Sequence, residues 1–276
     1  FQFIYALQKG TYSPWKSICF VILIPKPREV FAAHYQDRIA HHIAAPYMIA
    51  VAEAVHTANG NVSFGNRKGV SAYHACLRIQ RLMQENPEGI IVTFDIKGFF
   101  MSIDKQKAWE IFCYFEEKYR PKGYSPEMRA FVMNLIKQLI LHDPSTNCER
   151  HSPIELWDLI AKNKSLFYMH GIPIGNFYAQ IIANLILAVV CARTLKYNPT
   201  EFVDDFADIL KSIDLLPSCK SDTKEAVESI GLKLNENKQY IQPVRHGVKW
   251  CGFVVFPNRI YVENRPIHNC IYKLQT

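Results

Sequence analysis

Two adjacent aspartates, Asp204 and Asp205, constrain this chain more than any other feature. Apolar residues flank the pair on both sides, in the segment EFVDDFADIL at 201–210. These flanks predict two short strands, with the aspartates at or near the hairpin turn between them. Neighbouring carboxylates repel each other, so the pair indicates that something positive binds there. A divalent metal is the simplest candidate, because Mg²⁺ takes oxygen ligands from one or two carboxylates and from substrate phosphates.

A third carboxylate follows a predicted buried strand. Residues 90–94 are apolar and rich in β-formers, and they lead directly to Asp95. Three aspartates from two neighbouring strands would hold two metal ions about 3.5–4 Å apart, the arrangement used in nucleotidyl transfer. Taken singly, the residues leave other interpretations open: Asp95 could cap a helix, and the aspartate pair could belong to an ordinary turn.

The composition is that of a globular protein with a mild positive charge. The 276 residues are 49% hydrophobic, enough for one large domain or two closely packed subdomains. A formal net charge of +7 suits a polyanionic partner without demanding one. Eight scattered cysteines form no CxxC pair, which favours reduced thiols and a cytoplasmic location. The most apolar run, 181–192, is too short to span a bilayer, so we expect a buried helix and no membrane partner.

The predicted elements mix helices and strands without strict alternation. Strands are expected at 17–24, 90–94, on both sides of the aspartate pair, at 231–241 and at 247–256. Helices are expected at 36–48, 71–85, 105–119, 126–141, 177–191 and 224–230, with loops at 59–69 and 143–164. This order favours the α+β class, an antiparallel sheet backed by helices, over a doubly wound parallel sheet.

Six segments carry a resemblance to a known family. They are PKPREVFAAHYQDRIAHH (25–42), FDIKGFF (94–100), GIPIGNFYAQIIANLIL (171–187), FVDD (202–205), LKLNENKQYIQP (232–243) and GVKWCGFVV (247–255). In this order they resemble the reverse transcriptases of bacteria, most closely those of diversity-generating retroelements and related unassigned or phage-defence groups. The resemblance runs from about residue 18 to residue 265.

The resemblance implies right-hand polymerase fingers and palm, with an antiparallel palm sheet backed by helices and a thumb that is absent or truncated. The fingers would span 1–88 and the palm 89–256, with an inserted helical and loop region at about 120–170. Residues 257–276 would begin a connection to a missing thumb.

Catalytic roles follow from the same resemblance. Asp95, Asp204, Asp205 and the backbone carbonyl of Ile96 would bind two Mg²⁺ ions, with Mn²⁺ as a substitute. Asp205 corresponds to a position that more often supports than bridges the metals. Lys238 matches a lysine that protonates the leaving pyrophosphate, although a plain strand-edge lysine fits the residues equally well. Asp208 lies outside the pattern and is interpreted as a surface or structural residue.

The implied nucleotide-binding residues are Lys26, Arg28, Ile96, Phe99, Phe100, Ile174, Gly175 and Gln180. Lys26 and Arg28 would hold the triphosphate by neutralising its charge. A ring at Phe100 would clash with a 2′-hydroxyl and so select deoxynucleotides, but Phe99 is adjacent and equally bulky.

The segment at 174–180 carries a second implication. Ile174 stands where many reverse transcriptases have a polar Gln, and the diversity-generating enzymes share this aliphatic residue. Ala179 departs from their pattern, which has Ser there. Loss of a polar contact removes one means of rejecting mismatches, so the resemblance implies low fidelity.

The implied nucleic-acid contacts are Arg38, Arg67, Lys68, Trp250 and Gly252. Arg67 and Lys68 lie in the glycine-rich loop at 59–69, where they would contact template phosphates. Trp250 and Gly252 match the primer-grip turn, and Trp250 fits a core position equally well.

Together these features predict an RNA-directed DNA polymerase of low fidelity, in a retroelement or in antiviral defence. Its partners would be template RNA, an RNA or DNA primer, dNTPs, and an accessory protein or a dedicated noncoding RNA. Two alternatives stay open: template-independent or protein-primed DNA synthesis in phage defence, and a non-catalytic RNA-binding scaffold.

Overall fold

A computed structural model describes residues 2–24, 26–264 and 267 of the chain. It divides into two compact units, and both draw on separated stretches of sequence. Unit 1 comprises residues 1–55, 98–186 and 230–232, and unit 2 comprises residues 56–97, 187–229 and 233–276. The expected fingers and palm segments are contiguous, whereas these units are interleaved in the sequence. The assignment of fingers and palm therefore stays a prediction.

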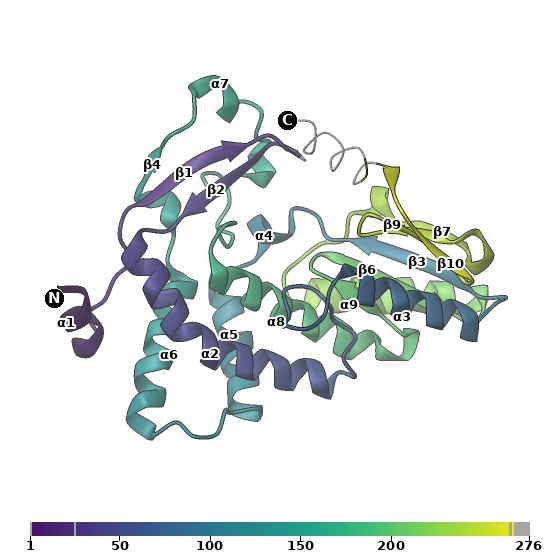
Figure 1. Cartoon of the computed structure of the whole chain (residues 1–276), viewed down its shortest axis with the longest axis horizontal. Coiled ribbons are helices and arrows are strands. Elements are labelled where there is room, and N and C mark those ends of the chain that lie inside the picture. The colour runs from purple at the N-terminus through teal and green to yellow at the C-terminus, as the bar shows by residue number, and fades with distance from the viewer. Residues whose placement is uncertain (1, 25, 265–266, 268–276) are drawn as a thin grey trace. The chain divides into compact units, whose positions relative to one another are not determined.

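Unit 1 combines helices with a small mixed sheet. Its helices are α1 (Gln2–Lys9), most of α2 (Tyr35–Ala58), α4 (Phe99–Ser102), α5 (Lys105–Lys118), α6 (Pro126–Leu141), α7 (Ile154–Trp157) and the first half of α8 (Phe177–Thr194). In the sheet, β1 (Ser17–Ile22) pairs antiparallel with β2 (Arg28–Ala32) and parallel with β4 (Cys148–Arg150). These strands lie side by side in Figure 1. Strand β2, which carries Arg28, was not predicted from the sequence.

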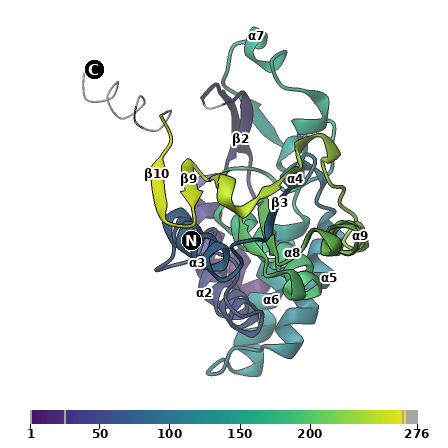
Figure 2. The same cartoon turned by 90° about the vertical axis from the view of Figure 1, so that its right-hand side faces the viewer.

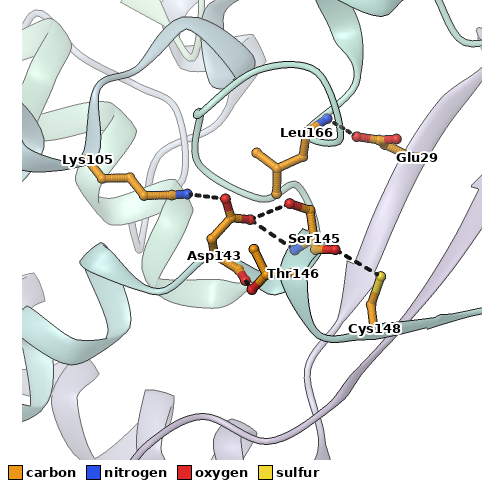
Figure 3. Close-up of polar contacts among 7 residues, drawn as sticks. All are labelled: Glu29, Lys105, Asp143, Ser145, Thr146, Cys148 and Leu166. Atoms are coloured by element: carbon orange, nitrogen blue, oxygen red, sulfur yellow. Dashed lines mark hydrogen bonds and ion pairs between the residues drawn. The ribbon is translucent and has the colours of Figure 1, made fainter.

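The irregular segment after α6 is tied to the rest of unit 1 by two carboxylates (Figure 3). Asp143 accepts hydrogen bonds from the backbone and hydroxyl of Ser145, at 2.9 and 2.6 Å, and pairs with Lys105 at 3.3 Å. Further along, Glu29 of β2 accepts hydrogen bonds from the Leu166 backbone N–H and the Ser165 hydroxyl. Burial raises the pKa of Glu29, and these two hydrogen bonds oppose the rise. The segment thus has fixed anchor points.

Unit 2 contains the sheet predicted around the aspartates. Its strands, in spatial order, are β5 (Thr200–Phe202), β6 (Asp205–Leu210), β3 (Ile90–Asp95) and β7 (Tyr240–Pro243). All neighbouring pairs in this sheet are antiparallel. The α+β class with antiparallel strands, predicted from the order of elements, is therefore confirmed.

A second small sheet and a helix complete the main core of unit 2. The sheet contains β8 (Val248–Trp250), β9 (Phe253–Phe256) and β10 (Arg259–Val262), all antiparallel. Helix α3 (Ala72–Glu85) lies against β9 and β10, as Figure 2 shows. Its buried residues Ile79 and Met83 share one apolar cluster with Ile91 of β3 and Ile209 of β6. Unit 2 also contains α9 (Leu216–Ser229) and the second half of α8.

Several predicted bounds were wrong. Helix α2 continues ten residues past the expected end at 48, to Ala58, because helix-forming and apolar residues follow its internal Pro46. Helix α9 begins at Leu216 rather than at 224. The expected strand at 231–241 reaches the sheet only as β7, since its first part folds around Asp95 instead.

The expected strand at 247–256 is in fact a hairpin. Trp250 pairs with Phe253, which leaves Cys251 and Gly252 as a two-residue turn with φ angles of 48° and 83°. Positive φ at both positions is the type I′ geometry that matches strand twist. The predicted connection at 257–276 includes β10, and most of its remainder lies outside the described residues.

Helix α8 is long and apolar enough to be compared with a membrane-spanning helix. With its short extension it covers 177–197 and passes by length and composition, but 72% of its most apolar window is buried inside the protein. That burial is typical of a core helix and confirms the buried helix predicted for 181–192. The expectation that the apolar run is too short to span a bilayer was wrong, because the helix extends beyond it at both ends.

An ion pair around the buried Glu116 stabilises unit 1. Glu116 on α5 accepts hydrogen bonds from the Tyr47 hydroxyl at 2.6 Å and from two nitrogens of Arg129 at 2.7 and 2.6 Å. These contacts, led by the Arg129 hydrogen bonds, lower the pKa of Glu116 to about 2.

We expect Glu116→Ala to lower the free energy of unfolding by about 1–3 kcal/mol, because it leaves the buried Tyr47 hydroxyl and the partly exposed Arg129 without their shared acceptor. Chemical denaturation at pH 7 measures this, with the exposed neighbour Glu117→Ala as control. The stabilisation by Glu116 is present above its unfolded pKa near 4.5 and should be lost as the pH falls toward 2. An equal effect of the two variants would contradict the role of the ion pair.

Candidate active site

The aspartate pair lies at a tight hairpin in unit 2. Phe202 of β5 pairs with Asp205 of β6, so Val203 and Asp204 form a two-residue turn, as the flanking residues predict. Asp205 is in turn the register partner of Asp95 at the end of β3. Direct cross-strand partners project from the same face of a sheet. The structure therefore brings Asp95 and Asp205 together and leaves Asp204 in the adjoining turn.

Negative charge is concentrated at this end of the sheet. The pKa of Asp205 is raised to about 6, first by burial and then by the charges of Asp204 and Asp95, with Lys238 opposing. A carboxylate crowded by like charges gains from a bound cation.

Asp95 is held from both its backbone and its side chain. Lys238 Nζ lies 3.1 and 3.2 Å from the two carboxylate oxygens, and Asn235 Nδ2 donates to Oδ2 at 2.9 Å. The Asn235 backbone N–H also donates to the Asp95 carbonyl at 2.8 Å. The sequence prediction named Lys238 and missed Asn235, although both lie in the segment LKLNENKQYIQP.

The carboxylates could bind a metal ion whose remaining ligands come from water and substrate phosphates. Among the described residues, no three His, Cys, Asp or Glu side chains are placed to hold one ion together. Mg²⁺, however, usually takes one or two carboxylates, with water and substrate phosphates as its other ligands. Asp95 and Asp205 supply two hard oxygen donors on one sheet face. Ile96 is buried and forms a β-bridge with Leu234, so its backbone lies next to the segment that carries Asn235 and Lys238.

Two further acids in unit 2 are fully buried. Glu201 in β5 is 0% exposed, and burial raises its pKa to about 8, while nearby Ser63, the Val203 N–H and the charge of Arg67 oppose the rise. Asp208 in β6 is 2% exposed, and burial raises its pKa to about 7, while Cys219 at 3.3 Å opposes the rise. Asp208 is therefore a structural residue and not a surface one.

The predicted nucleotide-binding residues of unit 1 lie on neighbouring segments. Arg28 is the first residue of β2, and Phe31 of the same strand donates its N–H to the Ile174 carbonyl at 2.9 Å. Gly175 has a φ of 110°, and a Cβ there would lie 2.7 Å from Val30. Only glycine fits this close approach to β2.

The two adjacent phenylalanines differ in burial. Phe99 is 3% exposed, whereas Phe100 is partly exposed and packs with Ile174 against the cluster around Phe31. The Phe100 carbonyl also accepts the Ile172 N–H at 2.8 Å, which joins this residue to the 171–175 segment. Phe100 is thus the more exposed of the two rings.

Two predicted nucleotide contacts remain on the surface of unit 1. Lys26 lies two residues before β2, and Gln180 lies in the first turn of α8; both side chains are exposed. Their roles stay predictions.

The predicted nucleic-acid contacts differ in exposure. Lys68 and Arg38 are exposed, and Arg38 Nε donates to the Ala33 carbonyl at 3.0 Å. Arg67 donates hydrogen bonds to residues of its own loop. Trp250 is buried in the apolar cluster under α3, which favours its core alternative, and Gly252 lies in the adjacent turn.

No protein-family model and no curated protein matches the chain. Solved telomerase structures do match it. That of Candida albicans with a TWJ fragment of telomeric RNA is 10% identical, with a TM-score of 0.62 over 95% of this chain and 49% of that one. That of Candida tropicalis with the same kind of fragment is 12% identical, with a TM-score of 0.64 over 95% and 47%.

A Candida tropicalis telomerase truncated from its C-terminal domain is 13% identical, with a TM-score of 0.63 over 94% of this chain and 59% of that one. The chain thus spans about half the length of these structures. At such low identity the likeness shows the fold alone, which is that of these telomerase structures. The resemblance to bacterial subgroups rests on the sequence motifs.

We expect Glu201→Gln to flatten the pH dependence of stability. A raised folded pKa means that the Glu201 contribution is fully present below its unfolded pKa near 4.5 and is lost as the pH rises toward 8. The amide cannot ionise, so the melting temperature of the variant minus that of the wild type should increase between pH 5.5 and pH 8.5. A difference that stays constant over this range would contradict the assignment.

Proposed function

We propose that this protein is an RNA-directed DNA polymerase that adds deoxynucleotides to a primer on an RNA template. The observation that carries the proposal is the pairing of Asp95 with Asp205 beside the Asp204 turn, in a fold of the reverse-transcriptase type. Two of the matching telomerase structures hold a fragment of telomeric RNA, which supports an RNA partner.

The carboxylates of unit 2 would perform the metal-dependent part. Asp95, Asp205 and Asp204 would hold two Mg²⁺ ions, with Mn²⁺ as a substitute. When bound, such ions activate the primer 3′-hydroxyl and neutralise the leaving pyrophosphate. Asn235 keeps the Asp95 carboxylate oriented through its 2.9 Å hydrogen bond. Lys238, which pairs with Asp95, would donate a proton to the pyrophosphate.

The residues of unit 1 would select and hold the nucleotide. Lys26 and Arg28 are exposed cations next to and at the start of β2, suited to a triphosphate. Phe100 would exclude a 2′-hydroxyl. Ile174 offers no polar side chain to the new base pair, from which we infer low fidelity. The cytoplasmic location, the retroelement or antiviral setting, and the accessory protein or noncoding RNA follow from the motif resemblance alone.

We expect Asp95→Asn and Asp204→Asn each to lower dNTP incorporation by at least about 100-fold, because each removes a charged metal ligand. Primer extension on an RNA template with labelled dNTP measures this, and circular dichroism checks that the fold is retained. Asp214→Asn, at an exposed position in the same unit, is the matched control. Near-wild-type incorporation by either aspartate variant would refute the metal assignment.

The two phenylalanines should separate in their effects. We expect Phe100→Ala to raise the use of ribonucleotides relative to deoxynucleotides by at least about tenfold, because it removes the blocking ring. Phe99→Ala should instead cost about 3–5 kcal/mol of stability, since it empties a core position. Incorporation assays with paired rNTP and dNTP, together with denaturation, distinguish them. The reverse assignment of the two effects would show that Phe99 is the selecting ring.

A further inference from the structure

The glycine-rich loop at 59–69 is built onto the aspartate hairpin. The Glu201 backbone N–H donates to the Val62 carbonyl, and the Phe64 N–H donates to the Glu201 carbonyl, both at 2.9 Å. Ser63 and Glu201 form an isolated parallel bridge. Because β5 is the outermost strand of its sheet, these bonds extend the sheet by one short segment. The loop is therefore attached directly to the strand that leads into the Asp204 turn.

The turn that the loop meets is strained. Val203 has a φ of 61°, a left-handed conformation that a β-branched side chain rarely adopts. Such a residue costs on the order of 1–3 kcal/mol and persists only where the surroundings hold it. Two-residue hairpin turns usually place Gly, Asn or Asp at such positions. Something in the fold must therefore stabilise Val203 in this geometry.

Gly65 supplies the contact. A Cβ on Gly65 would lie 2.7 Å from the Val203 backbone nitrogen and 2.8 Å from its Cγ2 atom. Gly65 is absent from the positive-φ glycines, so its own backbone does not require glycine. Glycine is therefore needed at position 65 because a side chain would not fit there. The loop backbone packs directly on the strained Val203.

Arg67 closes the loop on itself. Its guanidinium donates to the Ser63 carbonyl at 2.7 Å and to the Asn61 side-chain oxygen at 3.0 Å. Ser63 is the residue bridged to Glu201, so Arg67 stabilises the part of the loop that joins β5. The neighbouring Lys68 is exposed. Two adjacent cations therefore occupy different environments.

We propose that the loop at 59–69 is a brace that sets the position of the Val203–Asp204 turn, with Gly65 and Arg67 as positioning residues. Its consequence for metal binding rests on the proposed function, because the braced turn presents Asp204 and Asp205. Neither Gly65 nor Arg67 needs to touch substrate for this role. The brace explains why the chain retains a strained valine beside its paired aspartates.

The first test compares two glycines of the same loop. Gly65→Ala pushes on Val203, whereas Gly69→Ala strains a backbone with a φ of 81° and meets open space. Hydrogen exchange of amides at 200–210 reports the turn, and calorimetric titration with Mn²⁺ reports the ligands. We expect Gly65→Ala to speed exchange and weaken Mn²⁺ binding, each about tenfold or more, and Gly69→Ala to change neither by more than about twofold. Unchanged exchange in Gly65→Ala overturns the brace.

A second pair covers the case in which Gly65→Ala does not fold. Arg67→Lys keeps the charge but cannot reproduce the two-point hydrogen bonding of the guanidinium. Lys68→Ala removes the adjacent charge. The brace requires faster hairpin exchange and weaker Mn²⁺ binding in Arg67→Lys only. If both variants weaken RNA binding and neither alters exchange, Arg67 is a template contact and the proposal is overturned.

Asp95→Asn separates failure of the brace from failure of the polymerase proposal. If wild-type protein binds Mn²⁺ no better than Asp95→Asn, the proposed metal function fails, and exchange alone decides the brace. If the wild type binds through Asp95 and Gly65→Ala speeds exchange without weakening Mn²⁺ binding, the loop does not position the ligands and the inference is overturned.

Discussion

The register between β3 and β6 is the constraint on which the candidate site depends. It pairs Ile91 with Ile209 and Phe94 with Phe206 before it pairs Asp95 with Asp205. A slip of one residue would turn every side chain of one strand to the opposite face of the sheet. The buried apolar pairs make that slip costly, because it would expose them. Core packing thus holds two like charges together that would otherwise separate.

The surroundings of each buried acid decide its protonation. Glu116 lies against Arg129 and Tyr47, and its pKa falls to about 2. For Glu201 and Asp208 burial is the largest influence, and it raises their pKa to about 8 and about 7 even though the charge of Arg67 opposes the rise at Glu201. Asp205 lies between these cases at about 6, because it is partly buried and crowded by Asp204 and Asp95. A bound metal ion would lower the pKa of Asp205, as Arg129 lowers that of Glu116.

Much of this arrangement could be predicted from local sequence. The apolar flanks of Asp204–Asp205 specified a hairpin, and the run before Asp95 specified a buried strand, because both signals lie within a few residues. Glu201 and Asn235 were missed, since their partners Val62 and Asp95 are distant in sequence. Arg67 was assigned to template phosphates, because composition marks a loop without showing which backbone carbonyls its guanidinium meets. Phe99 and Phe100 have the same side chain, and only tertiary burial separates them.

The stretch between α6 and α8 determines whether the edges of the unit 1 sheet are open or covered. Strand β4 covers one side of β1, and the Phe31–Ile174 hydrogen bond occupies backbone on the far side of β2. An open strand edge invites pairing with another chain, and short or covered edges prevent it. Without the stretch between α6 and α8, β1 and β2 would form a two-stranded ribbon with both margins bare. The stretch between α6 and α8 therefore leaves neither margin of this ribbon fully open to pairing with another chain.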